Sequence, residues 1–126
     1  MKAKLQIHST VPVISTGSIQ ESISYYTKVL GFVADFEFGD PVYYAGIRSG
    51  EIEIYFAYDP DLSQLIKEKN LHPDIFIWLP DANASFKMHM ANGANIIEPI
   101  ADRQWGARQY VIEDINGYHL KFAQPI

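Results

Sequence analysis

The chain has 126 residues, of which 48% are hydrophobic and 20% are charged, and it contains no cysteine. These values are typical of one globular domain that needs no disulfides, and they exclude thiolate metal ligands and cysteine nucleophiles. The formal net charge is −5 and the ten Lys and Arg residues are scattered, so neither nucleic acid nor an anionic membrane is an expected partner. No apolar run reaches the roughly 18 residues of a membrane span, and no signal peptide is recognisable, so a cytoplasmic protein is expected.

The first elements are a short strand and a helix. Residues 11–14 predict a strand, and Pro12 places it at an edge or at a strand start. Ser18 and Glu21 have the spacing of a capping box, apolar residues follow at helical intervals, and Gly31 suits a C-terminal cap. A helix is therefore predicted over 19–30.

Three strands are predicted next, over 32–38, 42–48 and 51–58, separated by turn residues at 39–41 and 49–50. The last run alternates strictly between apolar and polar side chains. The alternation predicts that Ile52, Ile54 and Phe56 face a core. It places Glu51, Glu53 and Tyr55 on the opposite face.

The second half repeats this order. After a linker over 59–70 with one or two helical turns, the sequence predicts a strand over 74–79 and a helix from Asp81 to Gly93. Strands follow near 95–98, 108–113 and 118–123, and Asn116-Gly117 is a strong hairpin signal before the last of them. The caps of the two helices are offset by 62 to 63 residues, which indicates an internal repeat.

These elements predict an α+β fold in which two paired β-α-β-β-β modules form a curved mixed sheet around a concave cleft. Residues 1–126 form one domain, with module one over about 8–58, the linker over 59–70 and module two over about 71–124. A ligand would occupy the concavity. The sheet faces opposite the helices carry both aromatic and charged residues, namely Val11, Val13, Ser15, Glu51, Glu53, Tyr55, Asp74, Phe76, Trp78, His119 and Lys121.

Three motifs in order resemble the vicinal-oxygen-chelate superfamily, which contains glyoxalase I, extradiol dioxygenases, fosfomycin-modifying enzymes and bleomycin-resistance proteins. Residues 22–32 (SISYYTKVLGF) look like the family helix S-x-x-F-Y-x-x-x-L-G-F. Residues 104–108 (QWGAR) look like its W-G-x-R loop. Residues 114–117 (DING) look like its D-P-D-G turn, with isoleucine in place of proline. The segment 50–60 is most similar to the bleomycin-resistance branch.

The resemblance implies where a divalent metal would bind in the enzymes of the family. Its four ligand positions fall on Val11, Tyr55 (or Glu53 in a shifted register), Asp74 and Lys121. Valine has no donor atom and an ammonium repels a cation, whereas a catalytic site needs about three protein ligands. We therefore expect no metal, no other cofactor and no catalytic residue. An unconventional site in which His72 and His119 join Asp74 is the alternative.

The candidate ligand-binding residues are Trp105, Phe38, Tyr43, Tyr55, Glu53, Asp74, Phe76, Trp78, Arg108, His119 and Lys121. Trp105 can stack on a planar or cationic ligand or dock its loop against a second subunit. Asp74 and Lys121 either position a polar ligand or form a salt bridge. Phe38 and Tyr43, with the neighbouring aromatics at 36 and 44, line a groove or a dimer contact.

Two smaller expectations complete the set. Arg108 binds an anionic group or pairs with a carboxylate such as Glu98. His8 and His89 are surface or helix-packing residues with no role in binding.

The sequence thus predicts a metal-independent, homodimeric small-molecule binding protein. It would sequester an antibiotic-like or partly aromatic and cationic ligand, as bleomycin-resistance proteins do. The alternatives are a metal-dependent lyase or dioxygenase with an altered ligand set, and a binding domain for an unrelated ligand, because fold does not fix function.

Overall fold

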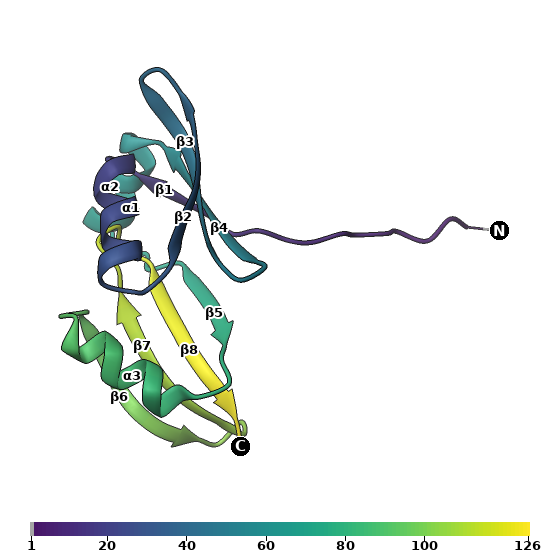
Figure 1. The fold of residues 1–126 in the computed structure, drawn as a ribbon, viewed down its shortest axis with the longest axis vertical. Coiled ribbons are helices and arrows are strands. Elements are labelled where there is room, and N and C mark those ends of the chain that lie inside the picture. Colours follow the sequence, from purple (N-terminus) through teal and green to yellow (C-terminus); the bar gives the residue numbers. More distant parts are fainter. Residues whose placement is uncertain (1) are drawn as a thin grey trace.

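The computed structural model describes residues 2–126, which form two β-α-β-β-β modules joined by a helix (Figure 1). Module one contains β1 (Val13–Thr16), α1 (Ile19–Lys28), β2 (Val33–Gly39), β3 (Val42–Ser49) and β4 (Ile52–Tyr58). The joining helix is α2 (Pro60–Glu68), and module two contains β5 (Asp74–Trp78), α3 (Ala82–Ala91), β6 (Ile96–Arg103), β7 (Ala107–Glu113) and β8 (His119–Pro125). The predicted α+β class with two such modules is confirmed.

The strands form two mixed sheets with equivalent topology. Their orders are β1-β4-β3-β2 and β5-β8-β7-β6, with β1 parallel to β4 and β5 parallel to β8. Within residues 2–126 no strand of one sheet pairs with a strand of the other, so the sheets stay separate. In Figure 1 the helices lie on one side of the sheets, and the N-terminal segment runs away from the other side. One face of each sheet is therefore left open.

The helix that joins the modules is longer than the one or two turns predicted. The Asp59 side chain accepts the backbone N–H of Leu62 at 3.1 Å, and Pro60 occupies the first turn, where it needs no N–H partner. Ser63 and Ile66 are buried on the inner side. The charged end of the segment, including Lys67, continues the helix because these side chains remain solvated on its outer surface.

Three strand predictions also need correction. β1 begins at Val13, two residues later than predicted, although the Pro12 carbonyl still accepts the Tyr55 N–H at 3.0 Å. β6 extends to Arg103, whereas the prediction ended this strand at residue 98. The prediction was too short because register irregularities around Glu98 interrupt the alternation of apolar and polar residues. Ile52 is exposed and not in the core, since it is the first residue of β4 after the turn.

None of the helices that residues 2–126 form exceeds ten residues, about 15 Å of helix, whereas a bilayer core is about 30 Å thick. None combines the length and the apolar character that a membrane span requires.

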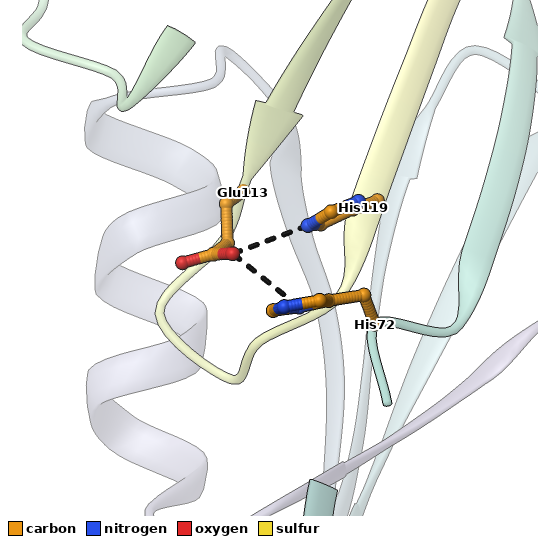
Figure 2. Close-up of side chains that lie close together, drawn as sticks. All are labelled: His72, Glu113 and His119. Carbon is orange, nitrogen blue, oxygen red and sulfur yellow. Dashed lines mark hydrogen bonds and ion pairs between the residues drawn. The ribbon is translucent and has the colours of Figure 1, made fainter. Parts of the chain in front are cut away.

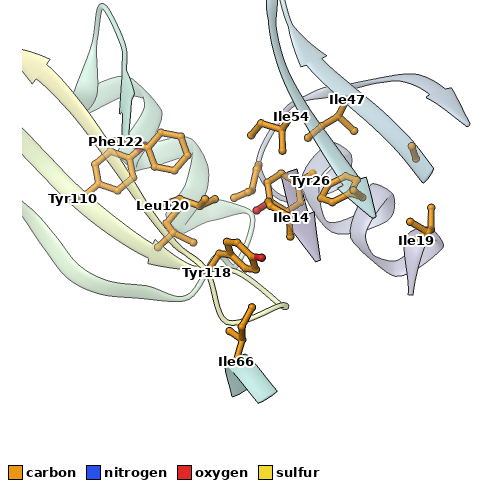
Figure 3. Close-up of a cluster of buried hydrophobic side chains, with 14 residues drawn as sticks. Ile14, Ile19, Tyr26, Ile47, Ile54, Ile66, Tyr110, Tyr118, Leu120 and Phe122 are labelled. Atoms are coloured by element: carbon orange, nitrogen blue, oxygen red, sulfur yellow. The ribbon is translucent and has the colours of Figure 1, made fainter. Parts of the chain in front are cut away.

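The two modules share one hydrophobic core (Figure 3). Ile14, Tyr26 and Phe56 contribute from module one, and Leu120 and Phe122 contribute from module two. All five are at most 2% exposed. Burial of aromatic and branched side chains such as these is worth about 1.5 to 3 kcal/mol each. The modules are thus held together by the same burial that stabilises each of them.

A hydrogen-bond network, formed by Ser22, Tyr26, Asp114, Asn116 and Tyr118, links the β7–β8 turn to module one. Asp114 accepts the Tyr26 hydroxyl and the backbone N–H groups of Asn116 and Tyr118, at 2.9 and 2.8 Å. The Asn116 amide donates to the Ser22 hydroxyl at 3.0 Å, and the Tyr118 hydroxyl accepts the backbone N–H of Ser15 at 3.0 Å. Burial raises the pKa of Asp114 although its three donors act in the opposite direction. We call these five residues the inter-module network.

A buried histidine makes a second link between the modules. His89 on α3 is 2% exposed, and its Nε2 lies 2.9 Å from the carbonyl oxygen of Leu30. A carbonyl only accepts, so Nε2 carries the proton and Nδ1 accepts the Tyr110 hydroxyl at 2.8 Å. Burial lowers the pKa of His89, which favours this neutral form. The expectation that His89 is a helix-packing residue is confirmed.

Candidate functional site

A cleft of about 850 Å³ lies between the two modules. Its volume is in the range of pockets that hold drug-sized ligands. The segment 9–12, the start of β4, the strand β5 and the inner side of α3 form its walls. The candidate residues that line it are Glu53, Phe76 and Trp78. Phe32, Met88 and Ile52, the last of which was expected in the core, line it too.

An aromatic pair forms one wall of the cleft. Phe76 and Trp78 are two residues apart on β5, so their side chains project from the same face of the strand. Their ring centroids lie 4.9 Å apart at 60°, an edge-on contact, yet they remain 44% and 59% exposed. Because the two rings meet edge to face and remain partly exposed, a ring face is available for a ligand in the cleft to stack on.

The carboxylates of the cleft lie at the start of β4. Glu51 is exposed, whereas Glu53 is bound at its two oxygens by Arg48 at 2.6 Å and by the Tyr55 hydroxyl at 2.9 Å. The hydrogen bond to Glu53 raises the pKa of Tyr55. Arg48 also contacts Asp35, at 3.2 Å. Glu53 is therefore held in position by its neighbours, and its charge is partly compensated.

Strand register identifies the four positions at which the resemblance places metal ligands. Ile14 pairs with Phe56 in module one as Ile77 pairs with Phe122 in module two. Counting from these pairs matches Val11 with Asp74 and Tyr55 with Lys121, which removes the shifted register with Glu53.

These four residues do not fit a divalent metal. The ammonium of Lys121 lies 3.0 Å from Oδ2 of Asp74, so the one carboxylate among the four already has a cationic partner. Val11 supplies no donor atom, and the hydroxyl of Tyr55 points to Glu53. A ligand set of this chemistry falls short of the three donors of a catalytic site.

The structure places two residues of the alternative site, His72 and His119, beside a carboxylate other than that of Asp74. The two imidazoles lie face to face, with ring centroids 4.1 Å apart, and both contact Glu113 (Figure 2). The Asp74 carboxylate instead pairs with Lys121. Glu113 was missed because it stands outside every family motif. The signal was its place opposite His119 in the predicted hairpin, where the two are cross-strand partners.

Trp105 and Arg108 lie outside the cleft. Trp105 is in the β6–β7 turn, 64% exposed, and its Nε1 donates to Gln109 at 3.2 Å. Arg108 bonds Asp102 and Asn83, each at 2.9 Å, so it pairs with a carboxylate as predicted, although that carboxylate is Asp102 and not the Glu98 given as the example. Arg108 pairs with Asp102 because the two residues lie opposite each other in the register of β6 and β7. Its contact with Asn83 places it on the α3 side of the sheet.

Phe38 and Tyr43 form a separate patch on the β2–β3 hairpin. Their ring centroids lie 5.6 Å apart, and Tyr43 lines a smaller hollow of about 530 Å³ with Pro41 and Gln20.

The structure thus brings three of the candidate residues, Glu53, Phe76 and Trp78, into one cleft. Tyr55 is hydrogen-bonded to Glu53 but does not line the cleft. Asp74, Lys121 and His119 lie beside it on the open face of the second sheet.

Comparison with known proteins identified one family model. Residues 6–122 match the Glyoxalase/Bleomycin resistance protein/Dioxygenase superfamily. A search of curated protein sequences found no significant match.

Many solved structures share the fold. The chain is similar to a bleomycin-binding protein from bleomycin-producing Streptomyces verticillus, complexed with copper(II)-bleomycin, with a TM-score of 0.78, 17% identity and coverage of 98% of this chain and 100% of that one. A glyoxalase-related enzyme from Clostridium phytofermentans gives a TM-score of 0.78, 18% identity and coverage of 99% and 100%. A bleomycin resistance determinant encoded on the transposon Tn5 gives 0.75, 17%, and 94% and 98%. At these identities the likeness shows the fold alone.

Proposed function

Because the chain belongs to the Glyoxalase/Bleomycin resistance protein/Dioxygenase superfamily, we propose that it reversibly binds a small, partly aromatic or cationic molecule in the cleft between its modules. Binding needs no metal at the family positions and changes no bond. The protein then acts by mass action, since it lowers the free concentration of its ligand in the cytoplasm.

The observation that carries this proposal is the composition of the cleft. Phe76 and Trp78 offer exposed rings on one wall, and Glu51 and Glu53 place carboxylates in the same cleft. Stacking on an aromatic face and a nearby negative charge both favour a flat cation. The Asp74–Lys121 ion pair at the family metal positions supports binding without metal chemistry. The solved structures named for bleomycin binding or resistance make bleomycin a rational first probe.

The test is a calorimetric titration of metal-free bleomycin into the untagged protein in buffer with EDTA. We expect one saturable site with a micromolar or lower Kd that does not change when EDTA is omitted. Turnover of a family substrate that requires an added metal ion would instead favour the lyase or dioxygenase alternative. No heat up to millimolar drug would contradict bleomycin-type sequestration and leave a binding domain for an unrelated ligand.

We also propose that two copies of the chain form a homodimer. Leu5 and Ile7 in the N-terminal segment are exposed, at 86% and 65%, and Val13 is exposed at the start of β1. A second copy of the chain would cover these apolar side chains. Sedimentation equilibrium is expected to give about twice the chain mass of 14.3 kDa. A mass of one chain at micromolar concentration would contradict the dimer.

A further inference from the structure

We propose that His72, Glu113 and His119 form a binding site for a divalent transition metal ion such as Zn²⁺, apart from the positions that the family uses. Three ligand-type atoms, one from each residue, lie within 4.8 Å of one another. Figure 2 shows both imidazoles directed at the Glu113 carboxylate from one side. The sequence-based expectation of a chain without metal was drawn from the family positions, and these residues do not belong to them.

The two distances from the carboxylate to the imidazoles agree with a tetrahedral site. Oε1 of Glu113 lies 3.3 Å from Nδ1 of His72 and 3.1 Å from Nε2 of His119. With metal–ligand bonds of about 2.0 to 2.1 Å, two ligands of a tetrahedral zinc ion lie about 3.3 Å apart. The rings are nearly parallel, at 15°, so each must tilt toward the other to direct its lone pair at one ion. The Gly117 carbonyl only accepts, so Nδ1 of His72 carries the proton in their 3.0 Å contact. Metal binding would break that contact and require the proton to move to Nε2 or to solvent.

The donor chemistry also selects a transition metal. Two imidazoles and one carboxylate are a known zinc ligand set that leaves one coordination position open. One oxygen of the Glu113 carboxylate faces a ring nitrogen of each histidine. The nearest ammonium along β8, that of Lys121, is neutralised by Asp74 at 3.0 Å and so opposes a cation less than a lone lysine would.

The backbone holds the three residues in place. Glu113 and His119 are cross-strand partners at the end of the β7–β8 pair, and the His119 N–H donates to the Pro73 carbonyl at 2.9 Å. His72 has a φ of 47°, a left-handed conformation that few non-glycine residues adopt and that costs free energy. That conformation places its ring against His119. The side chains are 20 to 32% exposed, so an ion can enter from solvent.

Calorimetric titration of ZnCl₂ into the EDTA-dialysed, untagged chain tests the proposal. We expect one ion per chain with a micromolar or lower Kd, and Co²⁺ in its place should give the visible absorption of a low-symmetry site. Glu113→Gln and His119→Gln should each weaken zinc binding at least about 100-fold, since even outer ligand partners contribute 10- to 100-fold. Circular dichroism would show that both variants are folded.

The matched control is Asp74→Asn, a carboxylate-to-amide change at a family position on the same sheet face. It removes the partner of the Lys121 ammonium but none of the proposed ligands, so it should weaken zinc binding less than about tenfold, far less than Glu113→Gln does. Loss of zinc binding in Asp74→Asn with retention in Glu113→Gln would overturn the proposal and move the metal to the family positions. Absence of binding to the unchanged chain at millimolar ZnCl₂ would also overturn it. Neither result would bear on ligand binding in EDTA.

Discussion

Replacing Asp114 by alanine is expected to lower the free energy of unfolding by about 3 to 5 kcal/mol, the largest effect of any single substitution considered for this chain. The carboxylate is 5% exposed and accepts three hydrogen bonds, from the Tyr26 hydroxyl and from the N–H groups of Asn116 and Tyr118. Alanine leaves those donors buried without a partner, and each costs about 1 to 3 kcal/mol. Urea unfolding followed by circular dichroism measures the loss.

A control and a double variant make this prediction specific. Asp61→Ala removes an exposed carboxylate from the first turn of α2 and should cost less than about 1 kcal/mol. Tyr26→Phe combined with Asp114→Ala should cost less than the sum of the two single changes, because each removes the partner of the other. A loss below 1 kcal/mol for Asp114→Ala, or strict additivity, would contradict the role of the inter-module network.

Replacing Trp78 by alanine is expected to weaken bleomycin binding at least about tenfold. Loss of a large aromatic contact in a ligand-binding cleft typically costs 2 kcal/mol or more. Trp78 is the most exposed ring of the cleft wall, so its substitution leaves the core of the second sheet intact. The same calorimetric titration that tests the proposed function measures the change, with the thermal midpoint as a check on folding.

The chain contains only two tryptophans, and the other provides the matched control. Trp105 is similarly exposed but lies in the β6–β7 turn, outside the cleft walls. Trp105→Ala should change the affinity less than threefold if the cleft of one chain holds the drug. A tenfold loss for Trp105→Ala with no loss for Trp78→Ala would contradict the cleft and favour the sequence-based choice of Trp105.

Local signals were sufficient to predict most elements of the fold. The Ser18 cap and the apolar spacing after it placed α1, and the turn at Asn116-Gly117 placed the start of β8. The errors arose where local signals conflict with tertiary structure. The predicted range of β6 was too short because bulges interrupt the alternation of its apolar and polar residues. Ile52 was assigned to the core but is exposed, because it is the first residue of β4 and the core does not extend that far.

The candidate site was harder to predict because its walls come from both modules. Alternation along β5 assigned Phe76 and Trp78 to one face, which is a local property. Membership of the cleft depends on how the modules pack, and periodicity carries no information about that. Met88, for example, has no sequence feature that distinguishes it from other helix residues, yet it lines the cleft. Glu113 contacts His72 only because the fold brings together two residues that are 41 positions apart in the sequence.

The inter-module network also constrains when the chain can fold during synthesis. Its contacts join residues 88, 94 and 103 positions apart, so the ribosome must complete β7 and its turn before α1 finds its partners. Until then the Tyr26 hydroxyl lacks its acceptor, Asp114, and the Ser22 hydroxyl lacks its donor, Asn116. Module one therefore cannot complete its hydrogen bonds while these residues are still to be synthesised. High sequence separation of this kind slows folding and prolongs exposure of apolar surface. A ribosome-bound chain that ends before Asp114 would therefore depend on chaperones more than the finished protein does.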